Sequence, residues 1–246
     1  MNALELHGLE KHYPDFALGP IDLELPGGTV CGLIGENGAG KSTTIKLILD
    51  MIDREAGTVK LFGQEGITPL AKADIGVVLG GEGIPTCLTA PQVGKVMAGI
   101  YPNWDAAAYA DWCRRFDLPE NKKYGDYSTG MKMKQCLAVA LSHHPKLLLL
   151  DEHTAALDPA TAEKVLALTK SIVAEKKITC LMVTHNMHQA LELGNRTLMM
   201  DAGRIVFDVK GEARSKMTVD DLLEKFRENA GKTLDNDRIL LSKVEQ

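Results

Sequence analysis

The hydrophobic positions along the chain follow two kinds of pattern. Short apolar runs predict strands over residues 3–6, 21–25, 29–34, 59–62, 75–79, 147–150, 179–184, 197–200 and 205–209. Apolar positions three or four residues apart predict helices over residues 42–51, 91–100, 105–116, 130–142, 160–176, 187–193 and 219–229. Because the two kinds alternate, the sequence predicts an α/β fold with a mainly parallel sheet covered by helices.

Three of the helical patterns follow one another without a strand between them. They lie within residues 85–143, so we expect a helical subdomain inserted into an α/β domain that covers residues 1–209. A short helical extension is expected over residues 210–246. Near the N-terminus, Pro14, Pro20 and Pro26-Gly27-Gly28 separate the apolar runs, which predicts short strands there.

Composition excludes several classes of protein. The 246 residues are 45% hydrophobic and 25% charged, which is typical of globular domains with a sizeable core. Lys and Arg number 28 against 33 Asp and Glu, so the net charge of −5 gives no strong overall basic field and no nucleic-acid partner is expected, although a local basic patch stays open. No apolar run approaches the roughly 20 residues that span a bilayer, so a membrane connection would need a partner. Reduced, cytosolic thiols are expected for the five scattered cysteines, Cys31, Cys87, Cys113, Cys136 and Cys180.

A glycine-rich segment between a predicted strand and a predicted helix carries the strongest chemical signal. Gly35-Glu36-Asn37-Gly38-Ala39-Gly40-Lys41-Ser42 fits the pattern G-x-x-x-x-G-K-[ST]. The glycines let backbone N–H groups turn inward around an anion, and the helix that follows adds its dipole. Lys41 would reach the β- and γ-phosphates, and the Ser42 hydroxyl would ligate Mg²⁺. The placement favours a nucleoside triphosphate site over a turn without a ligand.

Two acidic residues follow a second apolar strand. Asp151 and Glu152 come directly after the leucine run 147–150. Because ligands of doubly wound sheets bind at the carboxyl ends of the strands, we expect both acids to face the phosphate loop. Asp151 would hold Mg²⁺, and Glu152 would orient and deprotonate an attacking water.

The order of the motifs identifies a family. Tyr127-Ser128-Thr129-Gly130-Met131-Lys132 begins a helix before the acidic strand, Ala156-Leu157-Asp158-Pro159 follows that strand, and His185 follows the next. With the phosphate loop and the acidic pair, this order resembles the ATP-binding subunits of ABC transporters over residues 3–209. The resemblance implies a P-loop NTPase (RecA-like) core with a mainly parallel sheet, an N-terminal antiparallel β subdomain and an inserted helical subdomain.

The resemblance also implies roles for individual residues. Residues 35–43 match the Walker A loop, 128–131 the signature and 156–158 the D-loop. Glu152, His185 and Lys41 would be catalytic, and Ser42 and Asp151 would hold Mg²⁺. The expected ATP contacts are Tyr13, Gly35, Asn37, Gly38, Ala39, Gly40, Lys41, Ser42, Thr43, Ser128, Gly130 and Asp158. Tyr13 matches the aromatic residue that stacks on adenine, and Phe16 is the competing candidate.

Partners follow from the same resemblance. In this family the signature closes the ATP site of a second subunit, so a homo- or heterodimer around two ATP molecules is expected. That dimer would drive a separate membrane permease from the cytoplasmic face of the membrane. The signature here, Tyr-Ser-Thr-Gly-Met, resembles that of subunits serving ABC-2-type export permeases, so an exporter is expected. Two alternatives stay open: an ABC ATPase that is not coupled to transport, and a regulatory ATP-binding module with weak hydrolysis.

Some positions depart from the family pattern. Gly80 and Gly81 follow the strand 75–79, where a glutamine near Mg²⁺ is expected, and Glu82 is close enough to replace it. His153 occupies a place usually held by proline, and Ala156 one usually held by glycine. Both tryptophans, Trp104 and Trp112, lie in the helical block, where packing is favoured over a partner-binding role.

Overall fold

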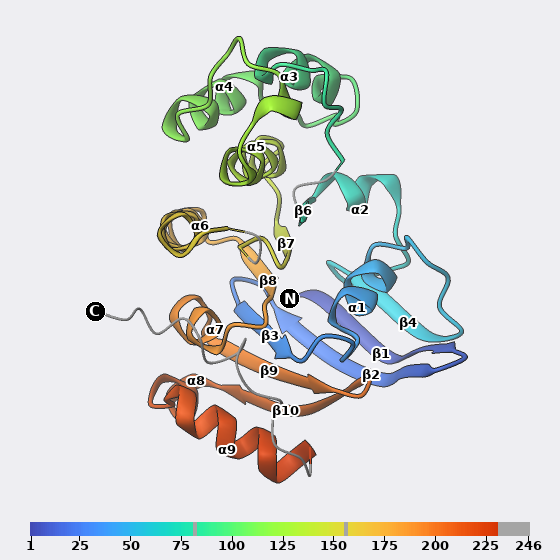
Figure 1. The fold of residues 1–246 in the computed structure, drawn as a ribbon. Helices are drawn as coiled ribbons and strands as arrows, with labels where there is room; N and C mark the ends of the chain where they lie inside the picture. The colour runs from blue at the N-terminus through green and yellow to red at the C-terminus, as the bar shows by residue number, and fades with distance from the viewer. Residues whose placement is uncertain (81–82, 155–156, 231–246) are drawn as a thin grey trace.

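The computed structural model describes residues 1–80, 83–154 and 157–230. Its centre is a six-stranded sheet in the order β10-β9-β3-β8-β7-β6 (Figure 1). These strands span β3 Val30–Gly35, β6 Ile75–Leu79, β7 Leu147–Asp151, β8 Thr179–Val183, β9 Arg196–Asp201 and β10 Arg204–Lys210. All neighbouring pairs are parallel except β9–β10. The predicted α/β class and mainly parallel sheet are confirmed.

Alternation along the central strands divides the interior into two cores. Leu147 and Leu149 of β7 lie in the core between the two sheets, whereas Leu148 and Leu150 lie in the core beneath the helices. Successive side chains of a strand point to opposite faces, so β7 buries all four leucines. A third, smaller core forms where helix α7 (Met187–Leu193) and helix α9 (Val219–Ala230) pack near β9.

A four-stranded antiparallel sheet covers one face of the molecule. Its order is β2-β1-β4-β5, from β1 Asn2–Tyr13, β2 Phe16–Pro26, β4 Ala56–Leu61 and β5 Gln64–Glu65. Strands form over both predicted runs, residues 3–6 and 21–25, but they are longer than predicted, because both runs belong to one long hairpin that turns at Pro14 and Asp15. Register shifts in the β1–β2 pairing interrupt the alternation of buried and exposed residues along the hairpin.

Helix α1 (Lys41–Ile48) packs beneath β3 and β7 and starts at the glycine-rich loop. The sequence predicted a helix to residue 51, but α1 ends at Ile48. Asp50 has a φ of 55°, a left-handed conformation that stops a helix. Two short helices had no clear apolar pattern: α2 (Pro69–Ala73) and α8 (Gly211–Ser215).

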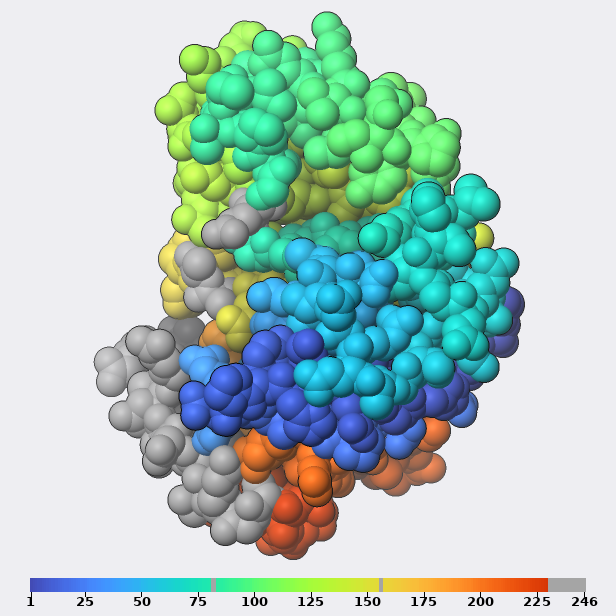
Figure 2. Space-filling view, turned by 90° about the vertical axis from the view of Figure 1, so that its right-hand side faces the viewer, coloured from blue at the N-terminus to red at the C-terminus, as the bar shows by residue number. Residues whose placement is uncertain are grey.

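Three helices stand at one end of the molecule. They are α3 Ala90–Ala98, α4 Ala106–Arg115 and α5 Thr129–Leu141. Figure 1 shows α5 between the sheet and the other two, and Figure 2 shows the residues of α3 and α4, in green, as an upper lobe. Trp112 is buried beside Phe116, and the rings of Trp104 and Tyr109 lie 5.1 Å apart, so both tryptophans pack within this lobe. Helix α6 (Pro159–Lys176) runs beside α5.

The turn between β9 and β10 joins three parts of the fold. The Gly203 N–H donates to the Ala39 carbonyl at 3.0 Å, and the Gly203 carbonyl accepts from the Gly19 N–H at 2.8 Å. Gly203 has a φ of 81°, and a Cβ there would collide with the Ala17 carbonyl oxygen. Only glycine fits this position. One residue therefore links the glycine-rich loop to the β1–β2 hairpin.

Candidate functional site

The glycine-rich loop forms a cradle at the carboxyl end of β3. Gly38 and Gly40 have φ angles of 84° and 105°, which few other residues adopt. Gly40 is the N-cap of α1, so free N–H groups and the positive end of the helix dipole face the loop. A Cβ on Gly40 would lie 2.7 Å from Leu18 Cδ1. The backbone is thus shaped to hold an anion.

Lys41 lies inside this cradle. Its ammonium donates to the Gly35 carbonyl at 2.8 Å and the Glu36 carbonyl at 2.9 Å, and it lies 3.9 Å from Glu152 Oε1. The side chain is only 4% exposed. Burial lowers the pKa of Lys41, and the nearby Glu152 and Asp151 carboxylates oppose that shift. The cradle therefore contains a buried positive charge next to its anion-binding N–H groups.

Ser42 and Asp151 bring two oxygen ligands together. The Ser42 hydroxyl donates to Asp151 Oδ1 at 3.2 Å. Burial raises the pKa of Asp151, while the Ser42 hydrogen bond lowers it. Mg²⁺ prefers oxygen ligands and takes few from the protein, because phosphates and waters complete its shell. A hydroxyl and a carboxylate at the cradle fit that ion.

Glu152 and His185 meet across adjacent strands. Glu152 follows β7, His185 follows β8, and His185 Nδ1 lies 3.8 Å from Glu152 Oε1. The Glu152 N–H donates to the Val183 carbonyl at 3.0 Å, which fixes Glu152 in a left-handed conformation with φ 44°. Interaction with His185 holds the pKa of Glu152 below its ordinary value. Glu152 is thus poised as a carboxylate beside the cradle.

Lys41, Ser42 and Glu152 line one cavity of about 530 Å³, while Asp151 and His185 do not reach it. Its lining residues are Asp15, Phe16, Asn37, Gly38, Gly40, Lys41, Ser42, Thr43 and Glu152. Phe16, the competing aromatic candidate, lines it, whereas Tyr13 stands beside it with its ring centroid 6.4 Å from that of Phe16. Asp15 was missed because it follows a proline in a turn, where an acid carries no sequence signal.

Three of the predicted ATP contacts, Ser128, Gly130 and Asp158, lie away from this cavity. Ser128 is the N-cap of α5, accepting from the Met131 N–H at 3.3 Å, and Asp158 is the N-cap of α6. Gly130 packs against α6, where a Cβ would lie 2.7 Å from Thr161 Cγ2. None of the three lines the cavity around Lys41.

Only part of the departures from the family pattern can be described. Gly80 is exposed and has a φ of 57°, while Gly81, the proposed replacement Glu82 and Ala156 lie outside the described residues. His153 is 1% exposed, and neither ring nitrogen has a partner among the described residues. Burial lowers the pKa of His153 to about 4, so the ring is neutral at pH 7.

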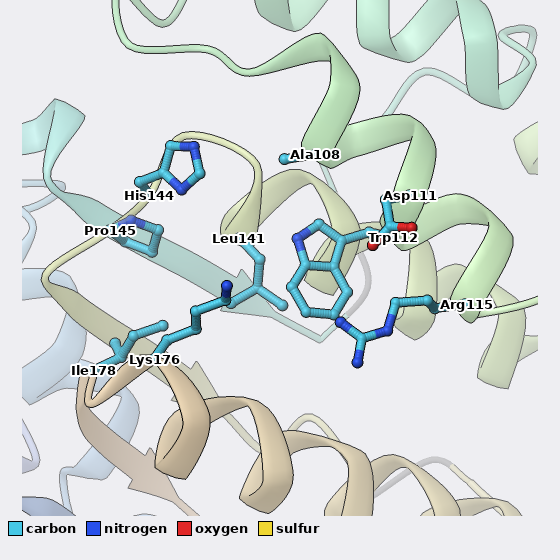
Figure 3. A pocket seen from close by; sticks show the side chains of 9 residues that line it. All are labelled: Ala108, Asp111, Trp112, Arg115, Leu141, His144, Pro145, Lys176 and Ile178. Carbon is cyan, nitrogen blue, oxygen red and sulfur yellow. The ribbon is translucent and has the colours of Figure 1, made fainter.

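A second hollow, of about 270 Å³, lies at the other end of the parallel strands from the cavity around Lys41 (Figure 3). Pro145 and Ile178, which line it, precede β7 and β8, so it opens at the amino ends of these strands. Arg115 and Lys176 stand at the last residues of α4 and α6, where cations offset the helix dipole. Arg115 also covers the Trp112 ring at 4.6 Å. None of its lining residues lines the cavity around Lys41.

Comparisons with known proteins agree on the family. The model of the family described as "ABC transporter" matches residues 18–155, more than half of the chain. A tyrosine transport ATP-binding protein of Clostridioides difficile is 32% identical over 91% of this chain and 98% of its own length. A methionine import ATP-binding protein, MetN 2 of Acinetobacter baylyi, is 32% identical over 82% of this chain and 64% of its own length.

A solved structure supports the fold. The dimeric post-hydrolysis state of the ATP-binding cassette MJ0796 bound to ADP and Pi superposes with a TM-score of 0.74 at 22% identity. The match covers 84% of this chain and 98% of that one. Among the described residues, no helix has the length and apolarity needed to cross a bilayer. The chain belongs to the ABC transporter family, as one of its ATP-binding, ATP-hydrolysing subunits.

Proposed function

We propose that this subunit pairs with a second ATP-binding subunit around two ATP molecules and drives a separate membrane permease from the cytoplasmic face. The observation that carries this proposal is the convergence of Lys41, Ser42 and Glu152 on one cavity, with Asp151 and His185 directly beside them. Such a set matches the needs of phosphoryl transfer: a phosphate cradle, oxygen ligands for a metal, and a base.

Binding would begin at the cradle. Free N–H groups at the start of α1 would bind the β- and γ-phosphates, and Lys41 would add a positive charge at short range. Ser42 and Asp151 would hold Mg²⁺, which supplies charge neutralisation on the phosphate oxygens when bound. Phe16 lines the open side of the cavity and Tyr13 lies beside it, so one of these rings would contact the adenine.

Hydrolysis would use Glu152 as the general base. Its lowered pKa keeps it ionised at neutral pH, ready to accept a proton from water. The water oxygen bonds to the γ-phosphorus while the bond to the bridging oxygen of ADP breaks, and Glu152 takes the water proton. His185, 3.8 Å from Glu152, would donate a hydrogen bond to a γ-phosphate oxygen.

A second subunit would complete each site. Ser128 and Asp158 are exposed at two helix starts away from the cavity around Lys41, so they are available to another copy or to a related chain, whereas Gly130 is buried against α6 in the single chain. ATP held between two surfaces stabilises the dimer, and its cleavage removes those contacts. The helical subdomain that we assign to residues 85–143 would meet the permease.

The direction of transport stays a prediction. The signature over residues 127–131 favours an export permease, whereas one relative at 32% identity is named as an importer. The direction of ATP-driven cargo movement in vesicles reconstituted with this subunit and the co-purified permease would decide between export and import. Recovery of ribosomes in place of a polytopic membrane protein would instead support an ABC ATPase that is not coupled to transport.

The Glu152→Gln variant tests the chemistry. We expect it to bind ATP, to lose turnover by about a hundredfold or more, and to accumulate as an ATP-bound dimer in gel filtration. Glu224→Gln, an exposed acid of α9, is the matched control and should behave as wild type. Equal turnover of Glu152→Gln and wild type would contradict the assignment of the base. An absence of ATP turnover in the wild-type chain with its permease would favour the regulatory alternative.

A further inference from the structure

One side chain joins the two loops that carry Glu152 and His185. Gln189 lies in the first turn of α7, and its Oε1 accepts two hydrogen bonds. The donors are the Thr154 hydroxyl at 2.9 Å and the Thr184 hydroxyl at 3.1 Å. Both threonines are buried, at 6% and 3% exposure, so neither hydroxyl has bulk water as an alternative partner.

Each threonine is part of one of the two loops. Thr154 follows Glu152 by two residues, and Thr184 directly precedes His185. The Thr184 N–H also donates to the Leu33 carbonyl at 3.1 Å, which anchors it to β3. Because one oxygen atom binds both hydroxyls, the separation between the loops is fixed by Gln189 as well as by the pairing of β7 with β8.

Gln189 is itself held rigidly. Its N–H donates to Asn186 Oδ1 at 3.1 Å, and the Asn186 N–H donates to the Thr184 hydroxyl at 3.0 Å. Further along α7, Ala190 is fully buried against Gly32. The Arg214 guanidinium donates to the Ala190 carbonyl at 2.7 Å. Helix α7 is therefore fixed at both ends, and Gln189 transmits that position to the two loops.

We propose that Gln189 is a positioning residue for ATP hydrolysis, setting the distance between the Glu152 carboxylate and the His185 ring. The inference rests on the proposed function, since it concerns the same two groups. Displacement of about 1 Å at a reacting centre can lower a rate about a hundredfold. An oxygen acceptor is required at this position, because both threonine hydroxyls donate to it.

Three substitutions in the full-length chain test this. Gln189→Met keeps the side-chain length and removes the acceptor, so we expect kcat for ATP to fall about tenfold or more with KM within about twofold. Gln189→Glu keeps an oxygen acceptor and should restore kcat to within about threefold of wild type. His188→Ala changes an exposed neighbour on the same helix and should match wild type.

The outcomes separate the hypotheses. A wild-type kcat for a folded Gln189→Met variant would overturn the inference while leaving the proposed function intact, and so would failure of Gln189→Glu to restore the rate. If Gln189→Met does not fold, Thr184→Val and Thr184→Ser repeat the test, and only the serine, which keeps the hydroxyl, should remain active. Combining Gln189→Met with Thr184→Val should cost less than the sum of the two single changes, because the bond between Thr184 and Gln189 is lost in both.

Discussion

The buried His153 ring makes the stability of this chain depend on pH. An unfolded histidine titrates near 6.5, whereas burial lowers the pKa of His153 to about 4. Between these values the unfolded chain binds a proton that the folded chain excludes. The free energy of unfolding must therefore fall as the pH falls from 6.5 towards 4, and the effect is absent above pH 6.5.

The magnitude follows from the size of this window. Each pH unit inside it removes about 1.4 kcal/mol of stability. Lowering the pH from 7 to 5 crosses about one and a half pH units of this window, so the titration of His153 should lower the free energy of unfolding by about 2 kcal/mol. Burial also lowers the pKa of His143, which adds a change of the same sign. That second change is common to wild type and to a His153 variant, and it cancels in their difference.

Urea unfolding of the nucleotide-free and Mg²⁺-free protein at pH 7 and pH 5 measures the effect. On going from pH 7 to pH 5, the free energy of unfolding of His153→Leu should fall by about 2 kcal/mol less than that of wild type. The exposed residue His188 supplies the control, and His188→Leu should follow wild type at both values. A relative change below about 0.5 kcal/mol, the scatter of ordinary surface substitutions, would refute the reasoning.

Two further predictions concern the cradle and the C-terminal helices. Gly40→Ala forces a Cβ to 2.7 Å from Leu18 Cδ1 at a φ of 105°, so we expect a loss of about 1–3 kcal/mol by urea unfolding and weaker ATP binding by calorimetry. Phe226 of α9 is 1% exposed, and Phe226→Ala should lower the free energy of unfolding by about 3–5 kcal/mol because it leaves a cavity in the third core. The midpoint of thermal unfolding should fall, while the ATP affinity of the native protein should stay unchanged.

The parts of the site that could be predicted are those encoded locally. The loop before α1 needs only a strand, glycines and a helix in succession, and all three are contiguous in the sequence. The contact of Glu152 with His185 is different, because it depends on β7 and β8 being neighbours in the sheet. Hydrophobic periodicity identifies strands but not their order, so that contact was not predicted, and the family resemblance supplied only the separate roles of the two residues. Gln189 was missed for a related reason: its contacts arise only when α7 docks on the two loops.

The long hairpin shows where the pattern misled the prediction. Pro20 normally indicates the end of a strand, yet β2 is the edge of its sheet, where a missing N–H breaks no pairing. Gly8 and Gly19 take positive φ angles at the register shifts and interrupt the alternation of buried positions. In α1, by contrast, apolar residues continue past the end of the helix, because Leu49 is buried as part of the loop that follows. Apolarity indicated the burial of Leu49 correctly, but not the exposure of Met51, and in neither element did it indicate the backbone conformation.

The link through Gly203 limits how this subunit can deform. The hairpin that carries Asp15 and Phe16 is tied to the same glycine as Ala39 in the phosphate cradle. If the antiparallel sheet tilts during a catalytic cycle, the cradle has to travel with it as one solid block. The wall that bears His185 is joined to β3 as well, because the Thr184 N–H donates to the Leu33 carbonyl, so a tilt of the antiparallel sheet should displace the cavity as a whole without changing its width.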